Sequence, residues 1–181
     1  QGDPKGVVEK AVLDASEVGN GVKVQNTDSK LGSPTNDICG KTWDSDKARV
    51  ARKQDHMFKE AKVASLVVSN EAVVYEKGKG ADALAELQKA IASCNGWKHD
   101  QGEMDDVQIV EPPAGALKDS FAWAGSDNRK GTEYSYLAVY QTNGDALSAL
   151  YIWATDKNDL NKAAKKLVPK AAKKLSDAVA S

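Results

Sequence analysis

The chain has 181 residues, of which 41% are hydrophobic and 28% are charged, and its formal net charge at pH 7 is -1. That length and apolar content suffice for one complete core, so we expect a single domain over residues 1–181. The balanced charge gives no electrostatic reason to expect a nucleic-acid partner, because phosphate binding needs a basic surface. No apolar run approaches the ~20 residues that cross a bilayer. Because the chain begins at Gln1 rather than at methionine, we expect a processed or trimmed protein, which fits an exported protein whose leader was removed.

The first 20 residues are predicted to form a helical segment. Asp3 suits the N-cap and Pro4 the first helical turn, and Gly19-Asn20-Gly21 ends the pattern. Apolar residues recur between these points at helical spacing, namely Val7, Val8, Ala11, Val12 and Ala15. A short strand over 21–25 and a polar surface loop over 26–36 follow.

The cysteines are Cys39 and Cys94, and the chain has no others. No Cys-x-x-Cys pair or Cys/His cluster suggests zinc. Cys39 precedes Gly40 in a turn-rich segment, where a thiol has little reason to serve as a core residue. The pattern favours one disulfide formed in an oxidising compartment, and two buried free thiols in a cytosolic protein are the alternative.

The stretch 63–97 predicts a strand followed by a helix. Residues 63–76 are rich in β-branched side chains and favour a strand, which we expect to pair with a second strand over 50–58. Residues 81–93 place apolar side chains on one helical face and deliver Cys94 at the end of that helix. Asn95-Gly96 stops the helix, because both residues tolerate the left-handed conformation.

The segment after Trp97 is more polar. It predicts a charged loop that contains His99, a strand over 107–110 and another over 116–123. Residues 124–131 are predicted to form a polar loop that contains Asp127 and Arg129.

A hairpin is the clearest local signal. Two alternating runs, 134–142 and 145–155, flank Asn143-Gly144, which is typical of a two-residue type I′ turn. Counting outward from that turn places Tyr136 opposite Tyr151 and Tyr134 opposite Trp153. One face of the hairpin is aliphatic. The other collects aromatic side chains, namely Tyr134, Tyr136, Tyr140, Tyr151 and Trp153.

Residues 157–181 predict a C-terminal helix with an apolar stripe and a lysine-rich solvated face. Pro169 is expected to kink or split it, because proline lacks an amide hydrogen. The elements together predict an α+β fold. Its sheet is twisted and mainly antiparallel, helices 80–95 and 157–180 pack on the aliphatic face, and a single disulfide between Cys39 and Cys94 ties a loop to a helix.

A family resemblance rests on four segments. They are Val68 to Tyr75, Ala83 to Leu87 running on to Cys94, Ala48 to Gln54, and Tyr140 to Gly144 leading to Ala149–Ile152. This pattern resembles the sensor-like domains of exported actinobacterial lipoproteins and of PknH-type receptor kinases. The resemblance implies an α+β fold outside the cytoplasmic membrane, a cleft for an unidentified ligand, and no catalytic residues. The kinase sensor domain is thought to hold two disulfides, whereas this chain can form one. A lipid-anchoring cysteine would lie upstream of residue 1.

Catalytic and cofactor motifs are not apparent in the sequence. It contains no Gly-x-Ser-x-Gly, Gly-x-Gly-x-x-Gly or Walker pattern, and Lys77-Gly78-Lys79-Gly80 lacks the P-loop spacing. His99 has acidic neighbours, but they do not form a calcium-loop pattern, and we expect a solvated loop there. We therefore expect no enzyme activity, no cofactor and no metal.

The aromatic hairpin face is the candidate ligand-binding surface, because Tyr and Trp combine apolar area with polar tips. The alternative is that a helix covers this face and makes it part of the core. We expect a monomeric, exported or cell-envelope protein that binds an unknown small molecule or envelope component through Tyr134, Tyr136, Tyr140, Tyr151 and Trp153. The alternatives are a cell-surface protein–protein interaction module that uses the exposed sheet face or the charged loops and, with less support, a hydrolase.

Overall fold

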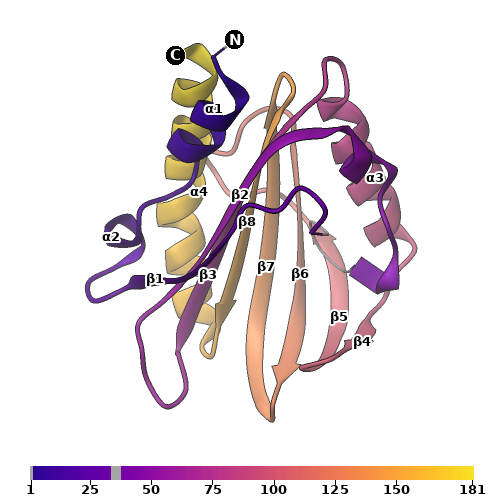
Figure 1. The fold of residues 1–181 in the computed structure, drawn as a ribbon. Coiled ribbons are helices and arrows are strands. Elements are labelled where there is room, and N and C mark those ends of the chain that lie inside the picture. Colours follow the sequence, from indigo (N-terminus) through magenta and orange to yellow (C-terminus); the bar gives the residue numbers. More distant parts are fainter. Residues whose placement is uncertain (1, 34–37) are drawn as a thin grey trace.

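The computed structural model describes residues 2–33 and 38–181, so Gln1 and part of the predicted loop 26–36 lie outside it. Eight antiparallel strands form one sheet in the order β1-β2-β3-β8-β7-β6-β5-β4 (Figure 1). Strands adjacent in the chain pair with each other within β1–β3 and within β4–β8, and the β3–β8 pairing joins these two groups. The strands are β1 Lys23–Asp28, β2 Arg49–Phe58, β3 Leu66–Tyr75, β4 Trp97–His99, β5 Gly102–Val110, β6 Ser120–Arg129, β7 Thr132–Asn143 and β8 Ala146–Ala154. The α+β class and the antiparallel sheet are confirmed.

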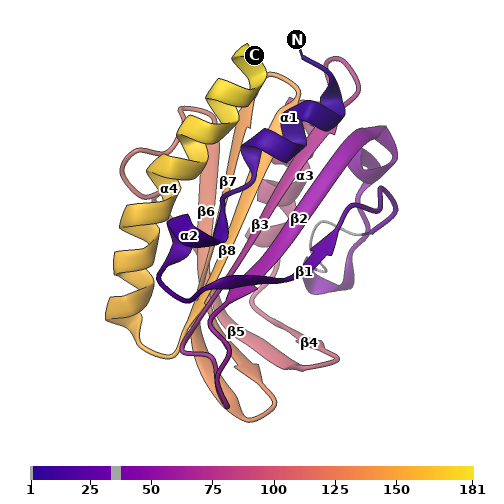
Figure 2. The ribbon, with the colours of Figure 1, turned by 60° about the vertical axis from the view of Figure 1, so that its left-hand side comes forward.

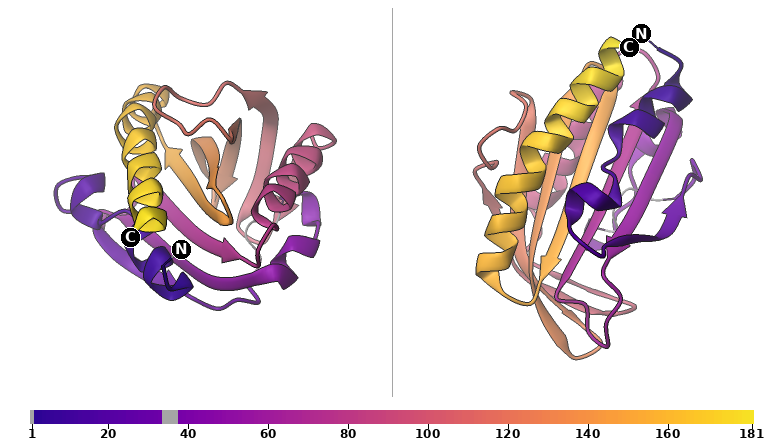
Figure 3. Two further views of the ribbon diagram at one scale, coloured as in Figure 1. Left: turned by 90° about the horizontal axis from the view of Figure 1, so that it is seen from above. Right: turned by 90° about the vertical axis from the view of Figure 1, so that its left-hand side faces the viewer.

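Helices lie on both faces of the sheet (Figure 3). The helical elements are α1 Pro4–Ala11, α2 Ala15–Val18, α3 Gly80–Ala92, α4 Lys157–Ala180 and the 3-10 helices η1 Ile38–Gly40 and η2 Asp44–Ala48. As predicted, α4 packs on the aliphatic face, against Val139, Leu150 and Ile152. The prediction that α3 shares this face is wrong, because Leu87 and Ile91 of α3 pack against the aromatic face. An amphipathic stripe shows that a helix is covered on one side, but it does not say by which sheet face.

The N-terminal segment contains two helices rather than one. Asp3 caps α1 as predicted, with its carboxylate accepting a hydrogen bond from the Gly6 amide at 3.1 Å. The chain leaves the helix at Val12, and the Leu13 amide donates to the side-chain oxygen of Asn70 at 2.8 Å. Asn70 is completely buried in β3, so this bond pins the break between α1 and α2 to the sheet. α1 lies beside α4 near the two chain ends (Figure 2).

Pro169 does not split the C-terminal helix, which continues through it from Lys157 to Ala180. Leu167 and Val168, immediately before the proline, are fully buried in the aliphatic core. Packing of that stripe therefore outweighs the lost backbone hydrogen bond. No helix in the described part of the chain is long and apolar enough to cross a membrane.

The predicted hairpin is confirmed, but its register differs. Asn143 pairs with Ala146, so that Tyr136 lies opposite Trp153, and Gly144 at the turn has a φ of 61°. The pairing is displaced by two residues from the predicted one, which leaves every side chain on its predicted face. The Asp145 carboxylate accepts hydrogen bonds from the Gly78 and Gly80 amides at 2.9 and 3.2 Å, which ties the turn to the start of α3.

Of the loop predicted over 124–131, residues 124–129 form a strand instead, and only residues 130–131 form a turn. β6 extends to Arg129 and pairs with β7 along its length, and the short strand β4 begins at Trp97 and runs into the segment where a loop was predicted. The polar composition of this segment hid a strand whose inward-facing polar side chain, Asp127, is completely buried.

The predicted Cys39–Cys94 disulfide is confirmed. It joins η1 to the residue two positions after the end of α3, with 6.4 Å between the two Cα atoms. Ile38 and Trp43 on either side of Cys39 pack into the same core as α3. The disulfide therefore links η1 to the end of α3, the two elements that cover the aromatic face.

Candidate functional site

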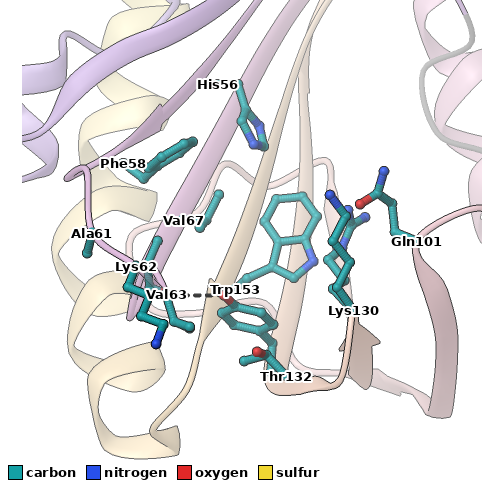
Figure 4. Close-up of a pocket in the computed structure, with 13 residues that line it drawn as sticks. His56, Phe58, Ala61, Lys62, Val63, Val67, Gln101, Lys130, Thr132 and Trp153 are labelled. Carbon is teal, nitrogen blue, oxygen red and sulfur yellow. Dashed lines mark hydrogen bonds between the residues drawn. The ribbon is translucent and has the colours of Figure 1, made fainter.

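A cavity of about 520 Å³ lies on the aromatic face, and its volume is within the range of small-molecule sites (Figure 4). The indole ring of Trp153 stands at its centre, so we call it the Trp153 pocket. Its walls come from β2, β3, β6, β7, β8 and three turns between strands. The lining residues are His56, Phe58, Ala61, Lys62, Val63, Ala64, Val67, Gln101, Arg129, Lys130, Thr132, Tyr134 and Trp153.

The five aromatic residues predicted to bind ligand do not form one surface. Trp153 and Tyr134 line the pocket, and the Tyr134 hydroxyl donates to the Ala64 carbonyl at 3.0 Å. Tyr136 and Trp153 line a smaller neighbouring hollow of about 150 Å³. Tyr140 and Tyr151 belong to the core beneath α3. Ligand binding by these residues stays a prediction, and the geometry narrows it to Trp153 and Tyr134.

Asp127 organises the wall of the pocket. Its carboxylate is completely buried and accepts hydrogen bonds from three side chains. One oxygen, Oδ2, accepts from Trp153 Nε1 at 2.8 Å and from Arg129 Nε at 2.6 Å. The other, Oδ1, lies 2.7 Å from His99 Nε2. The Asp127 carboxylate thus holds in place both the Trp153 ring and the Arg129 guanidinium, which face the cavity.

Arg129 lies over the Trp153 ring, with its guanidinium carbon 5.1 Å from the ring centroid. Cation–π attraction to the indole and the bond to Asp127 both act on the same guanidinium. The Arg129 side chain is 38% exposed, so its far side reaches solvent. The structure therefore presents a positioned cation over the face of an aromatic ring.

The prediction that His99 lies in a solvated loop is wrong. It ends β4, its side chain is 11% exposed, and its Nδ1 accepts a hydrogen bond from the Gln101 amide at 3.2 Å. An accepting Nδ1 places the proton on Nε2, which donates to Asp127. Within residues 2–33 and 38–181 no cluster of three or more His, Cys, Asp or Glu side chains could hold a metal ion.

The rim of the pocket is positive. Lys130, which follows Arg129 in the chain, and Lys62, on the opposite side of Trp153, are both exposed (Figure 4), and no aspartate or glutamate is among the described lining residues. His56 lies in the wall, with its ring centroid 6.0 Å from that of Trp153. Burial lowers the pKa of His56, and the positive charge of Arg129 lowers it further. His56 is therefore neutral at neutral pH and becomes an additional cation on acidification.

A second buried charge network lies on the same face at the other end of β2. Arg52 Nε is 2.5 Å from Glu71 Oε2, and Arg52 Nη1 is 3.0 Å from Asp28 Oδ2. Burial raises the pKa of Glu71 to about 7, against the opposing pull of Arg52. Arg52 also donates to the carbonyl of Lys30 at 3.2 Å, so this network holds the segment after β1 onto the sheet. It is a structural feature and does not reach the Trp153 pocket.

Sequence patterns missed several pocket residues. His56 and Phe58 lie in the predicted strand over 50–58, for which no face was assigned from the sequence, and Arg129 and Lys130 were predicted to lie in a loop. The signal that could have found the first two is the period of two along β2. His56 pairs with Ser69, which pairs with Tyr151, so this position of β2 faces the aromatic side.

Comparison with known proteins identifies the fold. No protein-family model matches the chain, and no curated protein sequence matches it. Among solved structures, the extracellular domain of PknH from Mycobacterium tuberculosis superimposes with a TM-score of 0.67 at 12% sequence identity, covering 96% of this chain and 98% of that one. The chain therefore shares the fold of that extracellular domain over nearly its whole length.

Proposed function

We propose that this protein is an extracytoplasmic, sensor-like domain that binds a small molecule in the Trp153 pocket without catalysing a reaction. The observation that carries the proposal is the buried Asp127 carboxylate, which holds Trp153, Arg129 and His99 at the pocket wall. A binding site of this kind requires side chains that are fixed before the ligand arrives.

The cost of this arrangement supports a functional role. Burying a charged carboxylate with its partners often stabilises a fold no more than apolar residues of the same size would. Here the burial fixes two groups that face a cavity, one aromatic and one cationic. Those are the groups that orient small ligands in mainly apolar pockets.

The extracytoplasmic location is supported by two findings. Disulfides such as Cys39–Cys94 persist in oxidising compartments and are rare in the cytosol. The solved structure that shares the fold is described as an extracellular domain. We propose on these grounds that the protein belongs to the cell envelope or its exterior.

Screening a metabolite library by ligand-observed NMR would test the proposal, with Trp153→Ala as the pocket variant. Trp43→Phe is the control, because Trp43 packs beneath α3 and does not line the pocket. We expect bound compounds to lose their signal with Trp153→Ala and to keep it with Trp43→Phe. Compounds that bind both variants equally, or a library in which none binds while a protein partner does, would refute it.

A further inference from the structure

We infer that the Trp153 pocket takes an amphipathic anion, a molecule with one carboxylate or phosphate group and an apolar body. This inference rests on the proposed function and adds the chemical class of the ligand. It follows from the way in which cationic and apolar side chains are divided within the pocket.

The cationic side is formed by Arg129 and Lys130, while Lys62 adds a positive charge at the opposite rim, beside Val63 (Figure 4). Only Nε of Arg129 bonds to Asp127, and within the described part of the chain no side chain or carbonyl accepts a bond from its two terminal nitrogens. Those nitrogens form the fork that binds carboxylate and phosphate oxygens in pairs. The charge of Arg129 is balanced by Asp127, so Lys62 and Lys130 give the pocket a net charge of plus two.

The apolar side faces this charge across the Trp153 ring. Phe58, Val67 and Tyr134 form the wall, and Val63 at the mouth is 50% exposed. Figure 4 shows Phe58 and Val67 on one side of Trp153 and Lys130 on the other. A ligand that fills the cavity therefore meets apolar surface along its body and the cations Arg129 and Lys130 at one end, with Lys62 at the opposite rim.

His56 adds a third contribution, because it lies between these two sides. Its ring meets Phe58 and Trp153 edge-on, with centroid distances of 5.8 and 6.0 Å. An anion bound at Arg129 would offset the positive charge that disfavours protonation of His56. Anion binding is therefore expected to strengthen as the pH falls below 6.5, the ordinary pKa of histidine, over the range in which the ligand keeps its negative charge.

A matched series of C8 compounds tests the inference, with affinities measured by NMR titration of the wild-type protein. Octanoate and octyl phosphate carry the anion on a carboxylate and on a phosphate, octanol and octylammonium carry none, and inorganic phosphate lacks the apolar body. We expect either C8 anion to bind at least about tenfold more tightly than octanol, octylammonium or phosphate. The stronger of the two anions then identifies the acid group.

Two charge variants localise the anion. Arg129→Gln is expected to weaken binding of the C8 anion about tenfold. The double variant Lys62→Gln/Lys130→Gln is expected to weaken it severalfold. The double variant Lys162→Gln/Lys170→Gln removes the same charge from the exposed face of α4 and is expected to leave the affinity unchanged.

The outcomes separate this inference from the proposed function. If octanol binds as tightly as octanoate and Trp153→Ala abolishes both, the anion assignment is overturned and small-molecule binding in the pocket stands. If the C8 anions bind equally well to wild type, Arg129→Gln and Trp153→Ala, they bind elsewhere, and the inference fails. If no member of the series perturbs a pocket residue, the assignment of an amphipathic anion is likewise overturned, and the metabolite screen decides on the proposed function by itself.

Discussion

The two ends of the aromatic face differ in what covers them. At one end Tyr140 and Tyr151 lie beneath α3, with exposed fractions of 0% and 2%. At the other end Trp153 and Phe58 are half-buried and line an open pocket. Trp153 and Tyr151 are two residues apart on the same strand, so strand alternation alone places both rings on one face.

The covered end and the open end also differ in polarity. Around Tyr140 the contacts are between rings, with Phe121 stacked at 4.9 Å and Trp123 Nε1 donating to the hydroxyl at 3.3 Å. Around Trp153 the contacts include a buried carboxylate and a guanidinium. The same face thus serves as core under α3 and as a candidate ligand site beyond it. Tests of stability and of binding should separate the two ends.

The largest expected effect is at the covered end. Tyr140→Ala should lower the free energy of unfolding by about 4 kcal/mol, because it empties a fully buried site. Trp153→Ala should cost about 2 kcal/mol, since part of that ring is already exposed. Urea unfolding followed by circular dichroism measures both, and Tyr140→Phe serves as the control that keeps the ring. Equal losses at Tyr140 and Trp153 would remove the distinction between the ends.

The disulfide provides the next test. Replacing both cysteines, as Cys39→Ser/Cys94→Ser, should lower the free energy of unfolding by about 3 kcal/mol. Hydrogen exchange should become faster in α3 and around Ile38, because the bridge fastens that cover. Binding of octanoate in the Trp153 pocket should persist under conditions in which the variant is folded. Loss of binding with unchanged exchange in α3 would show that the bridge supports the open end instead.

Much of the fold follows from local patterns in the sequence. The helices α3 and α4 each bury one face, so their apolar residues recur with the helical period. The strand over 66–75 is marked by its β-branched residues and the β7–β8 hairpin by alternating aliphatic and aromatic side chains, and these strands are buried on both faces. The hairpin register did not follow from Asn143-Gly144 alone. The Asp145 carboxylate accepts hydrogen bonds from two amides at the start of α3, and that long-range contact favours the observed turn.

Only part of the candidate site could be predicted from the sequence. The alternation of side chains along the two hairpin strands was enough to predict from the sequence that Tyr134 and Trp153 lie on one face. Asp127 could not be recognised, because burial of a carboxylate in a polar stretch depends on partners that are distant in the chain. Trp153 is 26 residues away and His99 is 28 residues away. The position of α3 decides which aromatic residues are covered and which stay exposed. The apolar stripe of α3 does not specify the sheet face on which the helix packs.

A smaller effect is expected at Asp127. Asp127→Asn should lower the free energy of unfolding by about 2 kcal/mol, because charge-assisted bonds from Arg129 and Trp153 are weakened. The indole N–H of Trp153 should exchange faster with solvent and shift in the NMR spectrum. Asp105→Asn, at an exposed position of β5, should change stability by less than about 0.5 kcal/mol. An unchanged indole signal would mean that Asp127 does not position the ring.

The smallest expected effect is on the titration of His56. This residue belongs to the open end of the aromatic face, where the positive charge of Arg129 acts on it. Its pKa should lie below the ordinary value of 6.5, owing first to burial and then to Arg129. The groups around it are the rings of Phe58 and Trp153 and the charge of Arg129. The unfolded state then binds more protons than the folded state just below pH 6.5, so the free energy of unfolding should rise with pH across that window.

Titration of the His56 ring signals by NMR measures this pKa directly. Arg129→Gln removes the cation, so the pKa of His56 should rise toward the ordinary value, whereas Lys170→Gln on α4 should leave it unchanged. Bound octanoate should raise it as well, because the anion offsets the same positive charge. A pKa that stays the same in Arg129→Gln would show that burial alone accounts for the shift. The open end would then lack the electrostatic coupling through which an anionic ligand could be sensed at His56.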